Sequence, residues 1–319
     1  MSHSELVTIF GGSGFVGTQI VQVLARAGYR IRVAVRRPDL AGHVRLLGAV
    51  GQVVPMQANV RNAASVLAAV RGADIVINLA AVGVERGKQR FRAVNVAGAK
   101  RVAEAAKAAG AARLVHMSVL GADVGSPSAF ARSRALGENE VRAAFPGAII
   151  MRPSVIFGSE DGFFNKLGLI SRMLPVMPLF SGETRFQPVY VGDVAEAVGQ
   201  AVAGQLKAGK VYELGGPDVL TNREIAERVL RYANRRNPIV RLPGFVGRLL
   251  ALPMSILPRP LLTGEQVTLL GIDNVVSAEA AKDKRTLAGM GIVARPVDAV
   301  LPSYLWRFSP NGQFDRQTA

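Results

Sequence analysis

Short apolar runs alternate with longer amphipathic segments through the first half of the chain. The apolar runs are rich in β-branched residues and predict buried strands at 6–10, 30–37, 52–56, 74–81 and 113–118. Between them, apolar residues recur at helical spacing, for example at 18–24, 64–70 and 88–109. Because strands that alternate with helices build parallel sheets, this order predicts an α/β fold with a doubly wound parallel sheet.

A glycine-spaced turn joins the first predicted strand to the first predicted helix. Its residues are Gly11, Gly12, Ser13, Gly14, Phe15, Val16 and Gly17. Gly11 suits the tight turn, Gly14 leaves the backbone open to phosphate, and Gly17 lets the helix pack closely on the strand. Since free N–H groups at a helix N-terminus bind pyrophosphate, the turn predicts a Rossmann-type dinucleotide-binding domain. A glycine-rich turn that holds no ligand is the alternative.

The end of the second predicted strand bears on the choice of cofactor. Arg36 and Arg37 stand where an acidic residue would hold the ribose 2′-hydroxyl of NAD. Arginine accommodates the 2′-phosphate of NADP, so we expect NADP(H), with two merely solvated arginines as the alternative. Small and amide residues near later strand ends let the backbone pass close to a nucleotide. The expected contacts there are Asn59, Val60, Leu79, Ala80, Ala81 and Asn95.

Charge and composition narrow the range of partners. Lysine and arginine number 39 against 23 acidic residues, a formal charge of +16. We therefore expect an anionic membrane surface or an acidic protein as partner, although a bias toward arginine in the source organism would give the same excess. The basic residues form no concentrated stripe and aromatic residues make up only 6%, so we expect no nucleic-acid partner.

Other functions are excluded by the residues that the chain lacks. It has no cysteine, which rules out disulfides, iron–sulfur ligation and thiol nucleophiles. His3, His43 and His116 show no ligand spacing, so no metal site is expected. The first predicted strand starts close to Met1, and charge or proline interrupts every window of about 18 residues that could span a bilayer. We expect a chain that is cytoplasmic or already mature, whose membrane contact is peripheral.

Several motifs together resemble the extended or atypical branch of the short-chain dehydrogenase/reductase superfamily, over roughly residues 4–215. They are the glycine turn, Asn78-Leu79-Ala80, Asn95-Val96, Ser118 and the run Arg152-Pro153-Ser154-Val155-Ile156-Phe157-Gly158. The resemblance implies further cofactor contacts, at Met117, Ser118, Arg134, Pro153, Ser154 and Ile156.

One departure from this superfamily concerns its chemistry. Active members carry Tyr-x-x-x-Lys, in which the phenol passes the proton and the lysine lowers its pKa and holds the nicotinamide ribose. The matching positions here are Phe130 and Arg134. Phenylalanine has no transferable proton, and a guanidinium is a poor proton relay although it can still bind ribose hydroxyls. We therefore expect no catalytic residues, unless Ser118 or a bound water replaces the missing acid.

More narrowly, the sequence is similar to the nucleotide-binding accessory subunits of respiratory complex I, the NADH:ubiquinone oxidoreductase. The similarity is carried by residues 130–138, 145–161 and 187–194 and extends loosely to the C-terminus. It implies tightly bound NADPH or NADP+ that is not turned over, at the junction of the peripheral and membrane arms near the quinone site. The implied partners are other complex I subunits. The implied location is the cytoplasmic face of a bacterial inner membrane, or the matrix side for a mature organellar chain.

The remaining residues are expected to form a smaller, mostly helical C-terminal cap. We expect residues 1–158, completed by 189–215, to form the nucleotide-binding domain, and 159–188 with 216–319 to form the cap and partner surface. Thr221 and Glu224 have the spacing of a capping box at the start of a helix. The broken apolar stretch 242–262, with arginines at its edges, suits a bilayer interface, a partner groove or the core of the cap.

Two other functions stay open from the residues alone. One is an active NADPH-dependent reductase or epimerase with an atypical proton donor. The other is a sensor that binds NADP+ and NADPH with different strength in two conformations and so regulates a partner. Phe130 argues against the first and does not bear on the second.

Overall fold

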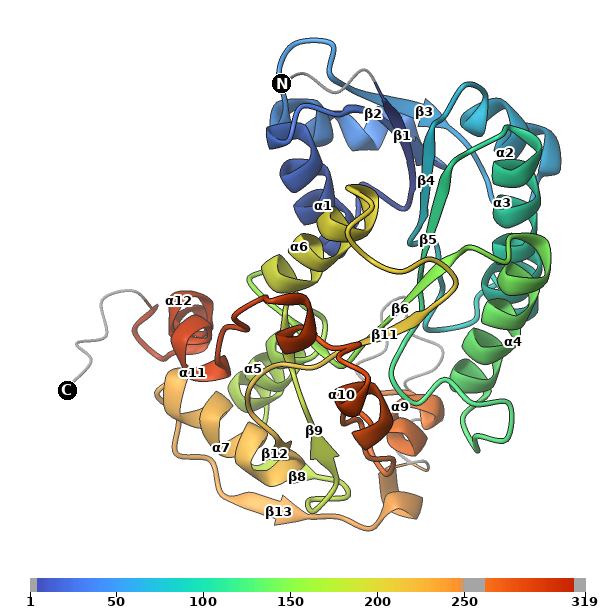
Figure 1. Ribbon diagram of the computed structural model, residues 1–319. Helices are drawn as coiled ribbons and strands as arrows, with labels where there is room; N and C mark the ends of the chain where they lie inside the picture. Colours follow the sequence, from blue (N-terminus) through green and yellow to red (C-terminus); the bar gives the residue numbers. More distant parts are fainter. Residues whose placement is uncertain (1–4, 248, 250–261, 313–319) are drawn as a thin grey trace. The chain divides into compact units, whose positions relative to one another are not determined.

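The computed structural model describes residues 5–247, 249 and 262–312 and divides the chain into two compact units. The first unit consists of Met1–Pro153, Val191–Leu214 and Ala278–Ile292. The second consists of Ser154–Tyr190, Gly215–Ser277 and Val293–Ala319. Figure 1 shows the helices and strands of both. Each unit has a hydrophobic core of its own.

A seven-stranded sheet forms the centre of the first unit, in the order β11-β6-β5-β4-β1-β2-β3, and all neighbouring strands are parallel. Its strands are β1 (Leu6–Phe10), β2 (Arg30–Val35), β3 (Val53–Gln57), β4 (Ile75–Asn78), β5 (Arg113–Met117), β6 (Ile149–Pro153) and β11 (Val211–Leu214). From β1 the chain runs outward to β3, then returns to β4 and continues to the other edge. This confirms the predicted doubly wound, Rossmann-type fold.

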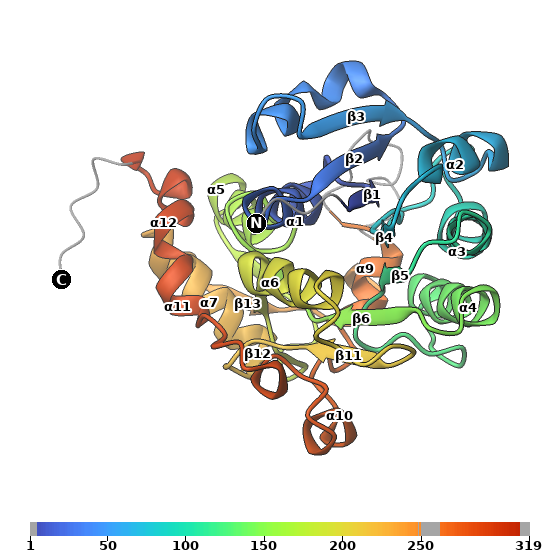
Figure 2. The same ribbon diagram turned by 45° about the horizontal axis from the view of Figure 1, so that its top comes forward.

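Helices cover both faces of this sheet. The helices of the first unit are α1 (Phe15–Arg26), α2 (Ala63–Val70), α3 (Ala97–Ala108), α4 (Ala129–Ala144), α6 (Val191–Val202) and α10 (Ala278–Lys282). Figure 2 shows α1 and α6 on one face and α2, α3 and α4 on the other. The other helical stretches are the 3₁₀-helical η1 (Pro38–Leu47) and η3 (Ala288–Met290) and the π-helical η2 (Arg92–Val96). The predicted helix over 88–109 thus begins as a π-helical turn.

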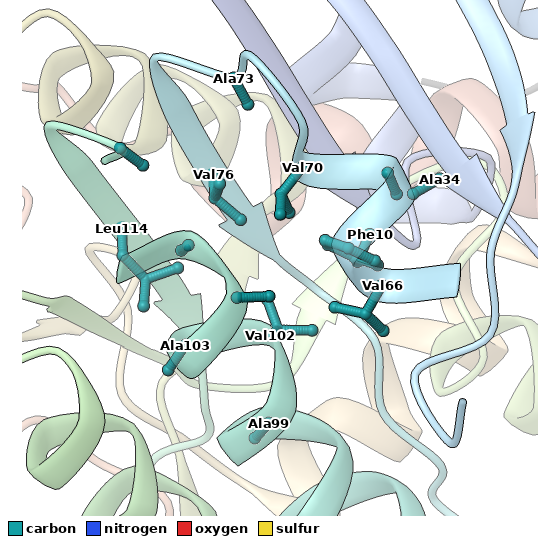
Figure 3. Close-up of a cluster of buried hydrophobic side chains, with 14 of the residues drawn as sticks. Phe10, Ala34, Val66, Val70, Ala73, Val76, Ala99, Val102, Ala103 and Leu114 are labelled. Carbon is teal, nitrogen blue, oxygen red and sulfur yellow. The ribbon is translucent and has the colours of Figure 1, made fainter. Parts of the chain in front are cut away.

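Small and β-branched side chains fill the space between the sheet and α2 and α3 (Figure 3). Val66 of α2 and Val102 of α3 are fully buried, as is Val76 of β4. Because helices cover both faces, the central strands are apolar on both sides and do not alternate, as Ile75–Asn78 illustrates. Burying one such valine stabilises the fold by about 1.5–3 kcal/mol relative to exposing it.

The second unit combines helices with short strand pairs. Its helices are α5 (Phe164–Met173), α7 (Asn222–Tyr232), α9 (Gly264–Leu269), α11 (Val297–Val300), α12 (Pro302–Leu305) and η4 (Trp306–Phe308). Its strands are β7 (Ile156–Phe157), β8 (Met177–Leu179), β9 (Arg185–Phe186), β10 (Val189–Tyr190), β12 (Leu220–Thr221) and β13 (Ile239–Arg241). The predicted capping box is confirmed, since the Thr221 and Glu224 side chains each bond the other's backbone N–H at the start of α7.

The division of the chain differs from the expected one at several places. Residues 154–158 and 189–190, which include the paired strands β7 and β10, belong to the second unit together with Gly215, and not to the nucleotide-binding unit. The stretch Ala278–Ile292 belongs to the first unit and not to the cap. Its Arg285 lies beside β11, where its carbonyl oxygen accepts a hydrogen bond of 2.9 Å from Glu213 N and its Nη1 donates to Val211 O at 2.9 Å. Leu287 and Ile292 are buried. The stretch therefore adds both hydrogen bonds and apolar contacts to the edge of the sheet.

Two negative findings concern the described residues. No helix among residues 5–247, 249 and 262–312 is both long enough and apolar enough to cross a membrane. Those residues also contain no group of three or more His, Cys, Asp or Glu side chains that could hold a metal ion. Most of the apolar stretch expected to meet a membrane or partner, 250–261, lies outside the described residues.

Candidate nucleotide-binding site

A cavity of about 340 Å³ opens at the carboxyl ends of β1 to β4 in the first unit. This is where parallel α/β sheets bind their ligands, next to the point at which the strand order reverses. Of the expected contacts, it is lined by Gly11, Ser13, Gly14, Arg36, Asn59, Val60, Leu79, Ala80 and Ala81. The further lining residues are Phe10, Ala34, Val35, Ala58, Val82, Gln89 and Val94. Residues from four strand ends thus converge on one cavity.

Backbone conformation or close packing requires glycine at some positions of the turn but not at others. Gly11 has φ of +83°, a left-handed conformation, and a β-carbon on Gly17 would lie 2.4 Å from Gly11 O. A β-carbon on Gly12 would lie 2.9 Å from Val33 Cγ1. At Gly14, in contrast, the nearest atom would be 3.5 Å away, an ordinary contact. Packing inside the protein therefore does not require glycine at position 14. The absence of a side chain there leaves the approach to the cavity open.

The N-terminus of α1 lies in this turn, and its first backbone N–H groups are not used by the helix. The first helical bond runs from Thr18 N to Gly14 O at 2.8 Å, so the N–H groups of Phe15, Val16 and Gly17 precede the helical ladder. No side chain caps this end and its first turn has no acidic residue. Because the helix dipole makes this end positive, the geometry suits an anionic group such as a pyrophosphate.

A second hollow of about 480 Å³ shares Ser13, Val35, Arg36 and Gln89 with the cavity. It is also lined by Arg37 and Arg61. Arg37 is exposed and forms an ion pair of 3.2 Å with Asp39. The Nε atom of Arg61 is buried and has no partner among the described residues. Sequence reasoning missed Arg61, which follows β3 closely and whose N–H bonds Asn59 Oδ1 at 3.0 Å in a tight turn.

Asn95 is held by the protein itself. Its Oδ1 accepts from Val82 N at 2.9 Å, and its Nδ2 donates to Val82 O at 3.1 Å and to Ser133 Oγ at 2.9 Å. The amide thus fixes the backbone of Val82, which lines the cavity. Asn95 is therefore placed to shape the cavity wall, in contrast with the direct contact expected from the sequence.

Behind the ends of β4 and β5 lies a buried group of polar side chains with unused hydrogen-bonding atoms. Arg134 is fully buried and donates from Nη2 to Met117 O, while its Nε and Nη1 have no partner in the described part of the chain. Ser118 Oγ and His116 Nε2 are likewise buried and unpartnered there. His116 Nδ1 lies 3.1 Å from Asn78 Nδ2 and accepts its hydrogen bond.

Burial governs the protonation of this group. Burial lowers the pKa of Arg134 to about 10, with nearby Glu138 acting in the opposite direction. Burial and the charge of Arg134 hold the pKa of His116 well below its ordinary value of 6.5. At neutral pH the group therefore carries one buried positive charge on Arg134 beside a neutral imidazole.

Phe130 occupies the position at which the superfamily has its tyrosine. It lies in the first turn of α4, one turn before Arg134, and its ring lies 6.0 Å from that of Phe91. An aromatic pair thus stands where active members carry a phenol. Phe130 offers no proton to a ligand bound beside it.

The other expected contacts divide between the two units. Met117 and Pro153 end β5 and β6 of the first unit. Ser154 and Ile156 belong to the second unit, where Ser154 Oγ bonds Asn274 Oδ1 at 2.6 Å. Within the first unit, the glycine cradle, the arginine-lined hollow and the unpartnered donors of Ser118 and Arg134 fit a dinucleotide cofactor.

Comparison with known proteins gives three findings. Residues 7–215 match the model of the NAD dependent epimerase/dehydratase family. The NADH dehydrogenase [ubiquinone] 1 alpha subcomplex subunit 9 of Arabidopsis thaliana is 37% identical over 290 residues, 87% of this chain and 72% of the relative. The ceramide reductase of Caulobacter vibrioides is 38% identical over 190 residues, 60% of this chain and 58% of the relative.

The fold also matches solved structures. The NADPH-dependent quinone oxidoreductase QOR2 of Escherichia coli, complexed with NADPH, superposes with a TM-score of 0.73. The match covers 94% of this chain and 98% of that one, at 19% sequence identity. At this identity the similarity concerns the fold alone.

Proposed function

This chain belongs to the NAD dependent epimerase/dehydratase family, and from that premise we propose that it is a non-catalytic, NADP(H)-binding accessory subunit of respiratory complex I. The observation that carries the proposal is the combination of a cavity beside the glycine turn, at the ends of β1 to β4, with Phe130 at the proton-donor position. The similarity to the complex I subunit of Arabidopsis thaliana over most of both chains supports the assembly.

The proposed cofactor is NADPH or NADP+, bound tightly. The turn from Gly11 to Gly17 would bind the pyrophosphate through the N–H groups at the start of α1. The guanidinium groups of Arg36, Arg37 and Arg61 would bind the 2′-phosphate, for which planar, charged donors are well suited.

At the nicotinamide end, Ser118 Oγ and Arg134 Nη1, which have no partner among the residues that the structure describes, would donate to ribose or carboxamide oxygens. A nicotinamide group supplies a hydride when it is bound, but transfer to a carbonyl also needs an acid. Phe130 cannot act as one, and the pKa of Arg134 at about 10 leaves it protonated at neutral pH. The nucleotide would therefore act as a structural ligand that stabilises the fold by binding only to its folded state.

We further propose that the partners are other complex I subunits and an anionic membrane surface, at the junction of the peripheral and membrane arms near the quinone site. The formal charge of +16 supports contact with anionic surfaces. The corresponding location is peripheral, on the cytoplasmic face of a bacterial inner membrane or on the matrix side in an organelle.

A reductase is the second candidate, because the chain is similar to the ceramide reductase of Caulobacter vibrioides over 190 residues. In that case Ser118, whose hydroxyl is buried without a partner among the described residues, would stand in for the missing phenol. The two candidates differ in whether bound NADPH is consumed.

Purified chain offers the test. Nucleotide released by denaturation is identified, and NADPH binding and oxidation are followed by fluorescence with ubiquinone and with a keto-sphingolipid. The proposal predicts bound NADP(H) at near one equivalent and no oxidation above the rate without protein. Steady oxidation with either acceptor would favour the reductase, and the absence of any nucleotide binding would contradict both candidates.

A further inference from the structure

The first unit has a second hollow, of about 650 Å³, at the opposite end of its sheet from the nucleotide cavity. The cavity follows the carboxyl ends of β1 to β4, whereas Lys210 in this hollow directly precedes the first residue of β11. Because all seven strands are parallel, the two lie at opposite sheet ends. The nucleotide proposed above therefore does not occupy this hollow.

Four cations line the hollow against a single carboxylate. Lys207 and Lys210 come from the loop before β11, and Lys284 and Arg285 from the stretch after α10. The carboxylate is that of Asp283. Segments more than seventy residues apart in the sequence thus bring like charges together, which is unfavourable without a counter-charge.

The nearby carboxylates are already engaged by Arg285. Its Nη2 lies 2.9 Å from Asp283 Oδ2 and 2.8 Å from Glu279 Oε1, and its Nη1 donates to Val211 O at 2.9 Å. The ammonium groups of Lys207, Lys210 and Lys284 form no ion pair with any residue that the structure describes. Three free cations therefore face the hollow.

The walls of the hollow are fixed before any ligand arrives. Tyr212 is buried and its Oη accepts a hydrogen bond from Lys207 N at 2.9 Å, while Gln200 Nε2 donates to Met290 O at 3.3 Å. Lys284 has φ of +55°, a conformation that residues with a side chain seldom adopt. The turn after it is so close that a β-carbon on Gly289 would lie 2.1 Å from Lys284 O. The backbone that carries the exposed lysine side chains is therefore preformed, so binding would order the side chains alone.

We propose that this hollow is a second anion site, which binds a phosphate group through Lys207, Lys210 and Lys284. An ammonium group is a compact point charge suited to phosphate oxygens, and the amide of Gln200 and the hydroxyl of Tyr212 add neutral polar groups. The volume accommodates more than inorganic phosphate alone, so the group belongs either to a free phosphorylated compound or to a phospholipid headgroup. The chemistry of recognition is the same in both cases.

The experiment compares two variants of equal charge. Lys210→Gln/Lys284→Gln removes a cation from each wall of the hollow, and Lys100→Gln/Lys107→Gln removes two from exposed positions on α3. Inorganic phosphate is titrated by calorimetry in wild-type and Gly14→Asp backgrounds. Because Gly14→Asp blocks the glycine turn, the heat that remains in this background comes from phosphate bound elsewhere. Flotation with vesicles of about 80% phosphatidylcholine and about 20% phosphatidylglycerol tests the lipid source, with pure phosphatidylcholine as the blank.

The expected result is a saturable signal whose affinity falls about four- to twenty-fivefold in Lys210→Gln/Lys284→Gln, since each exposed cation contributes about two- to fivefold. The Lys100→Gln/Lys107→Gln variant keeps it. Phosphate binding in calorimetry without vesicle flotation would identify a free phosphorylated compound as the ligand. Flotation without phosphate binding would identify a phospholipid headgroup. Equal losses in both variants, or no binding to either probe, would overturn the proposal. Both binding signals should persist in the Gly14→Asp background, so the test does not depend on NADP(H) binding.

Discussion

The choice between NADPH and NADH should depend on Arg61, which stands in the arginine-lined hollow next to the nucleotide cavity. We consider Arg61→Gln, which keeps a polar side chain, although one that is two atoms shorter, and removes the charge. The Nε atom of Arg61 is buried without a partner among the described residues, so a 2′-phosphate oxygen that it binds would be partly shielded from water. A shielded, charge-assisted hydrogen bond contributes about 1.5–3 kcal/mol.

This energy predicts that the Kd for NADPH rises about 10- to 150-fold in Arg61→Gln. Arg37→Gln should have a smaller effect, about two- to fivefold, because its side chain is 68% exposed and already paired with Asp39. The Kd for NADH should stay within about twofold in both variants, since NADH carries no 2′-phosphate. Arg45→Gln, an exposed arginine of η1 outside the hollow, is the matched control.

The assay is a fluorescence titration of each variant with NADPH and with NADH at one fixed salt concentration, because screening weakens exposed charge pairs. A loss of affinity for both nucleotides alike in Arg61→Gln would mean that the side chain supports the fold and does not recognise the phosphate. The same NADPH loss in Arg45→Gln would mean that only net charge matters. Either outcome would contradict the assignment of Arg61 to the 2′-phosphate.

Three further predictions concern the same unit. Gly14→Asp should abolish nucleotide binding while leaving the melting temperature of the nucleotide-free chain within a few degrees, since a β-carbon there meets no atom closer than 3.5 Å; retained binding in a titration would contradict the site. Phe130→Tyr combined with Arg134→Lys restores the residues of active superfamily members. Measurable NADPH oxidation by this double variant, but by neither single variant, would support the proposal that Phe130 and Arg134 leave the wild-type site inactive. The pKa of His116 lies well below 6.5 in the folded chain, so the unfolded chain binds more protons below that pH. The free energy of unfolding should fall by up to about 1.4 kcal/mol per pH unit below pH 6.5, and a flat acid limb in urea titrations would show that His116 titrates normally.

Much of the fold could be predicted from local sequence. The apolar runs and the glycine turn act over a few residues, so β1, α1 and the alternation of strands and helices follow directly from them. The cofactor cavity could be predicted in part for the same reason, because parallel strand ends meet at one sheet edge. Gly11, Gly14 and Arg36 were expected at the cavity and do line it.

The features that sequence reasoning missed depend on tertiary contacts. Arg61 has no motif around it, and only the fold of β3 against β2 brings it beside Arg36. Ala278–Ile292 returns to the edge of the sheet through the bonds of Arg285 to the backbone of β11, a pairing between positions far apart in the chain. Asn95 illustrates the converse, since its amide suits a ligand but Val82 and Ser133 already use its donors and acceptor.

Migration of the native chain during separation of membrane complexes would show whether it is a subunit of complex I. Membranes from the source organism are solubilised in mild detergent, the complexes are separated by size, and each fraction is assayed for this chain, for NADH:quinone oxidoreductase activity and for releasable NADP(H). If the chain is a complex I subunit, all three migrate together. Migration of the chain as a small species apart from that activity would contradict it.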